Sequence, residues 1–231
     1  MQNKTTTPNV SKAVIGRLPR YYRYLRELIS KDILRISSGE LAKLMNVTAS
    51  QIRQDLNCFG GFGQQGYGYN VKDLYKAIGD ILGVGESYSA IIVGAGHLGK
   101  ALAMSNAFVG RGVRLKGILD DDPQIVGSTV GEFTVLSLSA LEDYCKEWKP
   151  TIAAIAIPRI ADTAVYRAAV KEVADRLISL GIRGIWNFSG EELFLEEEVT
   201  VENVQLGDLL MTLCYEIHAK EQHESYEINQ I

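Results

Sequence analysis

The sequence predicts an α/β protein in which a small winged helix-turn-helix domain precedes a doubly wound parallel sheet. Two observations predict this fold class. First, a glycine pattern lies between two apolar runs at residues 90–119, and strand and helix patterns alternate after it. Second, three helical segments and a glycine-rich hairpin come before it. The expected domains are residues 1–86, 87–203 and 204–231.

Charge is distributed unevenly along the chain. The 231 residues carry a net charge of −4, yet residues 1–87 hold 12 Lys and Arg against 7 Asp and Glu, a net of +5. A basic segment suits a polyanion such as DNA, because each neutralised phosphate releases counterions. Charge alone leaves a solvated basic surface as the alternative.

The first domain is predicted to contain an amphipathic helix followed by a helix-turn-helix motif. Residues 11–29 place apolar side chains at helical spacing with arginines between them, which predicts an amphipathic helix. Ser37 and Glu40 have the spacing of a capping box, and Thr48 and Gln51 have the same spacing. The two predicted helices are joined by the three residues 46–48. Two short helices joined in this way are typical of a helix-turn-helix motif, whose second helix enters the major groove.

The third helix and the segment after it carry the predicted DNA contacts. Arginine can pair with guanine and glutamine with adenine in the major groove. Residues 59–70 alternate glycine with aromatic and amide residues, which predicts a β-hairpin that acts as a wing, with a flexible loop as the alternative. The predicted DNA-binding residues are Ser50, Gln51, Arg53, Gln54, Gln65 and Tyr67.

A helix over residues 70–82 leads to a Rossmann-like dinucleotide motif. The apolar run 90–93 enters the pattern Gly94-x-Gly96-x-x-Gly99, and the run 115–119 ends on Asp120. The first glycine permits the tight turn, the second admits the pyrophosphate, and the third lets the helix pack closely on the strand. The phosphates are expected at the N-terminus of that helix.

Asp120 is expected to accept hydrogen bonds from the adenosine ribose. Its charge would repel a 2′-phosphate, so the predicted cofactors are NADH and NAD+. Ile157 and Pro158 close a later strand at the edge where such folds bind ligands, although a proline that merely ends the strand is an equal alternative. The predicted cofactor-binding residues are Gly94, Ala95, Gly96, His97, Leu98, Gly99, Asp120, Ile157 and Pro158.

The remaining elements alternate as a doubly wound sheet requires. Strands are expected at residues 133–136, 151–157 and 182–188, and helices at 138–148 and 160–180. Residues 203–219 form an apolar helix that needs a partner, either its own sheet or a second subunit. The polar residues 220–231 are expected to be frayed.

Several function classes are disfavoured by the sequence. No apolar run reaches the about 18 residues that span a bilayer, and the N-terminus lacks the apolar core of a signal peptide, so a cytoplasmic protein without a membrane partner is expected. The cysteines, Cys58, Cys145 and Cys214, are too widely spaced for a disulfide framework or a metal site.

Two other functions are compatible with parts of the sequence. An NAD-dependent dehydrogenase with an accessory N-terminal domain would need an acid-base residue, but none of His97, His218 and His223 is well placed, so no enzyme activity is expected. Arg159 is a weak candidate for a substrate anchor. A CoA-binding module is disfavoured by Asp120.

Six collinear segments resemble the redox-sensing transcriptional repressor Rex family. They are RLPRYYRYL (17–25), ISSGEL (36–41), VTASQIRQDLNCFGGFGQQGYGYNV (47–71), GAGHLG (94–99), GIWNF (184–188) and VENVQLGDLLMTL (201–213). The resemblance implies a homodimeric repressor that binds double-stranded, palindromic operator DNA when NADH is scarce and leaves it when NADH accumulates. It also implies a domain-swapped C-terminal helix, and that Arg17 and Asp208 couple the domains.

The chain departs from the family pattern in two places. Ser105 stands where many members have a tyrosine that takes part in the switch. Residues 160–171 are longer than usual, with ADTAVYRAAVK inserted before the rest of the helix. This segment is expected near the nicotinamide end of the site.

Overall fold

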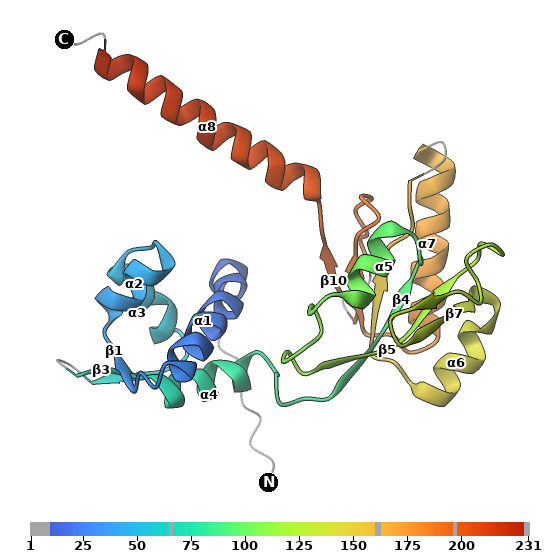
Figure 1. The fold of residues 1–231 in the computed structure, drawn as a ribbon, viewed down its shortest axis with the longest axis horizontal. Helices are drawn as coiled ribbons and strands as arrows, with labels where there is room; N and C mark the ends of the chain where they lie inside the picture. The colour runs from blue at the N-terminus through green and yellow to red at the C-terminus, as the bar shows by residue number, and fades with distance from the viewer. Residues whose placement is uncertain (1–9, 65–66, 160–162, 196–197, 229–231) are drawn as a thin grey trace. The chain divides into compact units, whose positions relative to one another are not determined.

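The computed structural model describes residues 10–64, 67–159, 163–195 and 198–228 (Figure 1). The chain divides into two compact units, Met1–Glu86 and Ser87–Ile231, which are described separately.

The first unit contains four helices and a small antiparallel sheet in its described residues. Its elements are α1 (Lys12–Ser30), β1 (Arg35–Ile36), α2 (Ser38–Met45), α3 (Ala49–Asn57), β2 (Gly63–Gln64), β3 (Gly68–Asn70) and α4 (Val71–Ile81). The strands lie in the order β1-β3-β2, so β2 and β3 form the hairpin expected after α3. Helix-turn-helix followed by a hairpin is the winged-helix arrangement that the sequence predicted.

Both predicted helix starts are present. The hydroxyl of Ser37 accepts a hydrogen bond from the N–H of Glu40, whose carboxylate accepts one from the N–H of Ser37. Thr48 caps α3 by accepting from the N–H of Gln51 at 3.1 Å, but the Gln51 side chain binds Asp55 and does not complete the second predicted capping box. These two N-caps fix where α2 and α3 begin. The core beneath them is apolar and includes Leu18, Leu25, Leu41, Ile52 and Leu74, all almost fully buried.

The second unit is built on a seven-stranded sheet. Its elements are β4 (Tyr88–Val93), α5 (His97–Met104), β5 (Val113–Asp120), β6 (Thr129–Val130), β7 (Phe133–Ser137), a 3-10 turn (Leu138–Ala140), α6 (Leu141–Trp148), β8 (Ile152–Ile155), α7 (Thr163–Ser179), β9 (Gly184–Asn187), β10 (Thr200–Asn203) and α8 (Leu206–Ile228). The strand order is β10-β9-β8-β4-β5-β7-β6. All neighbours are parallel except β6 and β7, so the predicted doubly wound parallel sheet is confirmed.

In the second unit, two of the observed strands were missing from the sequence prediction. The antiparallel β6 has only two residues, too few to show a hydrophobic period, and β10 alternates exposed and half-buried residues at the sheet edge. Beyond these corrections, the helix predicted over residues 138–148 begins as a 3-10 turn.

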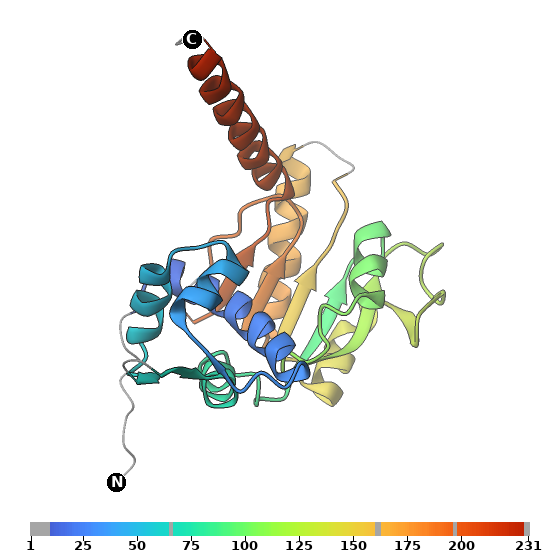
Figure 2. The ribbon, with the colours of Figure 1, turned by 60° about the vertical axis from the view of Figure 1, so that its left-hand side comes forward.

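The sheet is covered on both faces. Along β4, Ile91 and Val93 pack in one apolar cluster with residues of α6 and α7, whereas Ala90 and Ile92 pack in another with residues of α5. Figure 2 shows α7 lying along one face of the strands. Strand order reverses beside β4, so the carboxyl ends of β4, β5 and β8 meet at one edge, where ligands of such folds bind.

Helix α8 is longer than predicted and has no partner within the described chain. It continues to Ile228, so residues 220–228, expected to be frayed, belong to the helix. Its apolar side chains remain exposed, with Leu206, Leu209, Leu210, Leu213 and Ile217 each at least half accessible to solvent. Packing onto its own sheet, one of two predicted alternatives, is therefore not observed. Among the described residues, no helix combines the length and hydropathy needed to cross a membrane.

Candidate dinucleotide cavity and DNA-binding surface

The three glycines of the turn between β4 and α5 differ in how much space surrounds a Cβ at each position. A Cβ on Gly99 would lie 1.8 Å from the carbonyl oxygen of Gly94, and Gly94 itself has φ of +101° with a carbonyl oxygen 2.6 Å from where its Cβ would be. A Cβ on Gly96 would meet only the side chain of Pro158, at 4.0 Å. The fold thus requires glycine at two positions, whereas at Gly96 the open space is available to a ligand.

The N-terminus of α5 is open to an anion. Gly96 is the N-cap residue, and no side chain caps the helix. Uncapped N–H groups at a helix start carry partial positive charge and bind phosphate readily. Of the two predicted contact residues that follow, His97 is exposed, whereas Leu98 is half-buried and packs on the sheet.

Asp120 holds the turn in place. Its carboxylate accepts hydrogen bonds from the N–H of Ala95 at 2.5 Å and from the N–H of Asp122 at 2.8 Å, and the residue is only 7 % exposed. A carboxylate has about four acceptor positions, so two remain for a ligand hydroxyl. Ala95 is fully buried and its N–H is already engaged, so this predicted contact residue shapes the turn and offers no free donor.

A cavity of about 290 Å³ lies beside the turn. Its lining is largely apolar and consists of Val93, Gly94, Gly96, Asp120, Asp121, Asp122, Ile125, Leu138, Ile157, Pro158, Val165, Tyr166, Ala169 and Val173. Sites for small molecules commonly measure roughly 300–1,000 Å³. The cavity therefore lies at the lower end of the range for small-molecule sites.

The segment predicted to be longer than usual contributes three residues to this cavity. Val165, Tyr166 and Ala169, all within it, line the same cavity as Asp120, the residue predicted for the adenosine ribose. The expectation that this segment borders the nicotinamide end stays a prediction. Residues 160–162 lie outside the described chain.

Ser105 serves as a local cap. Its hydroxyl donates to the carbonyl of Leu102 at 2.8 Å and accepts from the N–H of Ala107 at 3.1 Å, at the end of α5. Both groups belong to its own turn. In this structure Ser105 therefore stabilises the end of α5.

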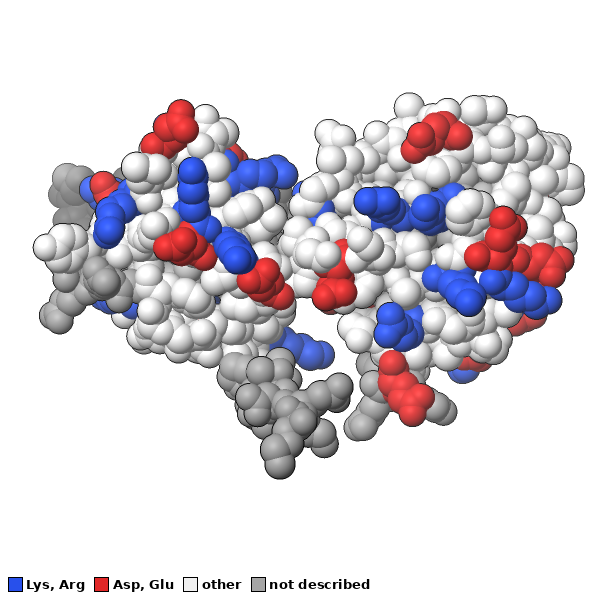
Figure 3. Space-filling model, turned by 90° about the horizontal axis from the view of Figure 1, so that it is seen from below, with Lys and Arg blue, Asp and Glu red and all other residues white. Residues whose placement is uncertain are grey.

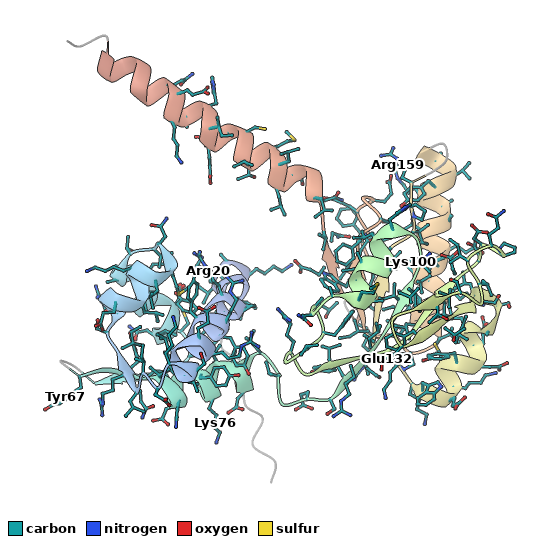
Figure 4. The ribbon with its side chains drawn as sticks, viewed as in Figure 1. Arg20, Tyr67, Lys76, Lys100, Glu132 and Arg159 are labelled. Carbon is teal, nitrogen blue, oxygen red and sulfur yellow. The ribbon has the colours of Figure 1, made fainter. Side chains whose placement is uncertain are left out.

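The candidate DNA-binding surface is the polar face of α3 with the wing. Ser50, Arg53 and Gln54 are exposed, and Arg53 donates a hydrogen bond to the hydroxyl of Ser38 at 3.1 Å. Tyr67 is 70 % exposed and points outward from the wing, with the Arg35 guanidinium 5.9 Å from its ring centroid (Figure 4). Gln65 lies outside the described residues.

Asp55 connects this surface to the core, a role that the sequence gave no reason to predict. It is 1 % exposed and accepts two hydrogen bonds from Arg17, both at 2.7 Å, one from Tyr21 at 2.8 Å and one from the Gln51 amide at 2.7 Å. Burial alone would raise the pKa of Asp55, but these donors outweigh it and hold the pKa below its ordinary value. The carboxylate therefore stays charged and ties α1 to α3.

Two predicted residues take on unexpected contacts through Asp55. Gln51 turns its amide inward, so its donor group is not available to DNA in this structure. Arg17, expected to couple the domains, is committed to the recognition helix α3. Asp208, its expected counterpart, lies exposed in the first turn of α8 in the other unit.

The face in Figure 3 carries basic and acidic side chains interspersed over both units. No cluster of three or more His, Cys, Asp or Glu that could hold a metal occurs in the part of the chain that the structure describes. His97 is exposed beside the glycine turn, and His218 lies on α8, 3.0 Å from Gln222.

Comparison with known proteins identifies the family. Residues 9–57 match the family model "Putative DNA-binding protein N-terminus", and residues 85–190 match "CoA binding domain". The chain is 48% identical to the redox-sensing transcriptional repressor Rex of Thermoanaerobacter pseudethanolicus over 96% of its own length and 94% of that protein. Rex of Clostridium perfringens is 47% identical over 89% and 93% of the two chains. This chain belongs to the Rex family.

Solved Rex-family structures share the fold over most of the chain. A crystal structure of the repressor RSP in complex with NAD+ and operator DNA has a TM-score of 0.81 and 46% identity, and covers 94% of this chain and 97% of that one. RSP in complex with NADH has the same TM-score, with 43% identity and coverage of 94% and 98%. The winged-helix and Rossmann-like arrangement predicted from the sequence is thus that of the Rex family.

The glycine contacts predict a contrast between two substitutions. We expect Gly99→Ala to lower the free energy of unfolding of the second unit by about 2–3 kcal/mol, because its Cβ would overlap the Gly94 carbonyl. Gly96→Ala should change it by less than about 1 kcal/mol, since the position is open and its φ is negative. Urea unfolding followed by tryptophan fluorescence measures both; equal losses would contradict the assignment.

The Asp55 contacts predict a pH-dependent loss of stability. We expect Asp55→Asn to destabilise the first unit by about 2–4 kcal/mol at pH 7, because it removes the charge from a buried, paired carboxylate. A depressed pKa stabilises the fold above the ordinary value near 4 and ceases to do so as pH falls through the native value. The difference should therefore shrink below about pH 4.

Urea unfolding at pH 7 and at pH 3, followed by circular dichroism, measures this difference. Asp80→Asn is the matched control, because Asp80 is exposed on α4 and lies outside the Asp55 contacts. A loss of stability that is the same at both pH values would show that the ion pair does not stabilise the fold.

Proposed function

We propose that this chain is a DNA-binding transcriptional repressor that senses the NADH/NAD+ ratio. It binds a palindromic operator when NADH is low and is released when NADH accumulates. The observation that carries the proposal is the presence, on one chain, of an exposed recognition helix and a glycine-turn cavity. RSP, which shares both units with this chain, has been solved with NAD+ and operator DNA together. The chain is a regulator in the cytoplasm and not an enzyme.

The three predicted segments divide this function. Residues 1–86 bind DNA, residues 87–203 bind NAD(H), and residues 204–231 hold the dimer together. Arg53 reads guanine and Gln54 reads adenine in the major groove, with Ser50 beside them. Tyr67 and Gln65 on the wing contact the sugar-phosphate backbone or the adjacent minor groove. Gln51 acts indirectly, by fastening α3 to Asp55.

The NAD(H) site is centred on the turn at residues 94–99. The pyrophosphate lies at the N-terminus of α5, where Gly96 leaves room for it. Asp120 accepts hydrogen bonds from the adenosine ribose with the acceptor positions that Ala95 and Asp122 leave free. Ile157 and Pro158 border the cavity from the end of β8.

Discrimination between the two cofactor forms must come from the nicotinamide end. NAD+ and NADH share the adenosine and differ in one ring, which is cationic and planar when oxidised and neutral when reduced. Contacts to adenosine therefore give affinity to both forms. To move the dimer from mostly bound to mostly released, NADH must favour the released state by roughly 5.5 kcal/mol, shared between two sites.

Arg17 and Asp208 transmit the change between the domains. Arg17 already holds the carboxylate that anchors α3, so any new partner for Arg17 alters the support of the recognition helix directly. NADH thereby displaces the two recognition helices from successive major grooves.

A homodimer supplies the two recognition helices that a palindromic operator requires. Helix α8 exposes an apolar stripe that a single chain leaves uncovered, and exchange of this helix with a second subunit buries it. Two-fold symmetry then lets one recognition helix per chain read each half of a palindrome.

The direct test is a titration of NADH and of NAD+ into the protein bound to a labelled palindromic operator fragment. Fluorescence anisotropy should report release by NADH at concentrations at which NAD+ leaves the complex intact. Release by neither nucleotide would refute the sensor. Turnover of NADH with a candidate hydroxy acid or keto acid would favour a dehydrogenase instead.

Substitutions in the two units should separate the two activities. We expect Arg53→Ala to weaken operator binding by about tenfold or more while NADH affinity stays unchanged, because one bidentate base contact contributes about 1–3 kcal/mol. Asp120→Ala should weaken NADH binding by about tenfold or more and leave the affinity for DNA unchanged. Lys76→Ala, on the exposed side of α4, is the control for loss of positive charge. Either variant losing both activities while still folded would contradict the division.

A charged residue in the α8 stripe should prevent dimerisation. We expect Leu213→Glu to give a monomer by sedimentation velocity and to lose operator binding, since a carboxylate cannot be buried at an apolar interface without a large penalty. Thr212→Glu is the control, because it lies on a different side of the helix from the stripe. A Leu213→Glu protein that remains dimeric would show that α8 is not the interface.

A further inference from the structure

The start of α7 is the part of the chain that the proposed function leaves unexplained. The resemblance predicted that residues 160–171 are longer than usual for the family, and α7 begins at Thr163 within them. Three of its residues, Val165, Tyr166 and Ala169, line the cavity that also contains Asp120. They project into it from one helix, since positions three and four apart share a face.

Tyr166 fixes this part of the helix to the sheet. The side chain is 3 % exposed, and its hydroxyl lies 2.8 Å from the carbonyl oxygen of Ile157 and 2.8 Å from that of Ser189. These carbonyls follow the ends of β8 and β9, two neighbouring strands. One hydroxyl thus joins the helix to both strand ends at the ligand edge of the sheet, and burial raises its pKa, which keeps the proton in place.

A second contact fastens the next residue. Arg167 donates to the carboxylate of Glu191 at 2.8 Å, and the Glu191 side chain is only 9 % exposed. Glu191 belongs to the loop after β9, two residues beyond Ser189. The hydrogen bonds of Tyr166 to Ser189 and of Arg167 to Glu191 therefore attach the first turns of α7 to this loop.

The surface that α7 presents to the cavity is apolar and uncovered. Val165 is 64 % exposed, and Ala169 is exposed beside it on the next turn. Ile125 and Leu138 supply further apolar lining, and Asp120 supplies the acceptor. An apolar cavity with a carboxylate near it fits a flat, uncharged base attached to a ribose, because the base is buried and the ribose hydroxyls donate to the acid.

We propose that the first turns of α7 form the adenine-binding wall of the NAD(H) site. Val165 and Ala169 pack on the ring, and Tyr166 is the positioning residue that holds them there. The inference rests on the proposed function, and it assigns the segment from Val165 to Ala169 to the adenosine half of the ligand. The segment then adds affinity for every ligand that contains adenosine and takes no part in distinguishing NADH from NAD+.

Three ligands and two variants test this assignment. Isothermal titration calorimetry of the full-length protein with NADH, NAD+ and ADP-ribose measures the affinity, and ADP-ribose lacks the nicotinamide altogether. Val165→Ser should weaken all three by the same factor, about four- to tenfold, since each buried methyl group contributes about fourfold. Ala169→Phe should weaken all three more strongly by filling the cavity. Ala168→Phe is the matched control, because Ala168 is exposed on the same helix but does not line the cavity.

The pattern across ligands decides the outcome. A parallel loss with an unchanged ratio of NADH to NAD+ affinity supports the proposal. A loss for NADH or NAD+ with ADP-ribose unaffected would place the segment at the nicotinamide end and overturn it, as would unchanged affinities in both variants. Failure of the wild-type protein to bind NADH would instead refute the proposed function.

Tyr166→Phe tests the positioning role. The variant keeps the ring and removes the hydroxyl, so we expect ADP-ribose affinity to fall about threefold or more at a temperature well below unfolding. Hydrogen exchange of the first α7 amides should accelerate at the same time. A lowered melting temperature with unchanged affinity and exchange would show that Tyr166 only stabilises the fold.

Discussion

The dinucleotide site depends on the close packing of the start of α5 against the end of β4. There is no room for a Cβ at Gly99, whose nearest neighbour would be the Gly94 carbonyl at 1.8 Å. This crowding places the uncapped helix N-terminus at the carboxyl edge of the sheet, where it attracts phosphate. It also brings the N–H of Ala95 to the carboxylate of Asp120 at 2.5 Å, so the turn itself orients the acid that we propose binds the ribose.

A buried carboxylate organises the DNA-binding unit in a comparable way. Asp55 gathers donors from α1 and from its own helix, and the recognition helix is held by that charge as well as by apolar packing. An arginine on α1 is therefore in direct contact with the element that reads DNA. A signal that changes the partner of Arg17 needs no long chain of intermediate residues to reach α3, which suits a switch between two arrangements.

The sequence predicted features with local signatures and missed those that depend on distant pairing. Capping boxes, the glycine turn and alternating strands recur at fixed spacing, so both units and most elements were predictable. Arg17 and Asp55 are 38 positions apart, and no local pattern shows that they meet or that Gln51 turns toward them. Val165 and Tyr166 read as ordinary helix residues, because only the folded chain shows that they share a cavity with Asp120. The length of α8 was underestimated because its last turns are polar.

The central claim is that NAD(H) binding and operator binding are coupled through one dimer, and linkage tests it most directly. If NADH lowers operator affinity by some factor, operator DNA must lower NADH affinity by the same factor. Calorimetric titration of NADH into the free protein and into the protein saturated with operator should therefore give two dissociation constants whose ratio equals that factor. Equal NADH affinity in the two titrations would contradict the account.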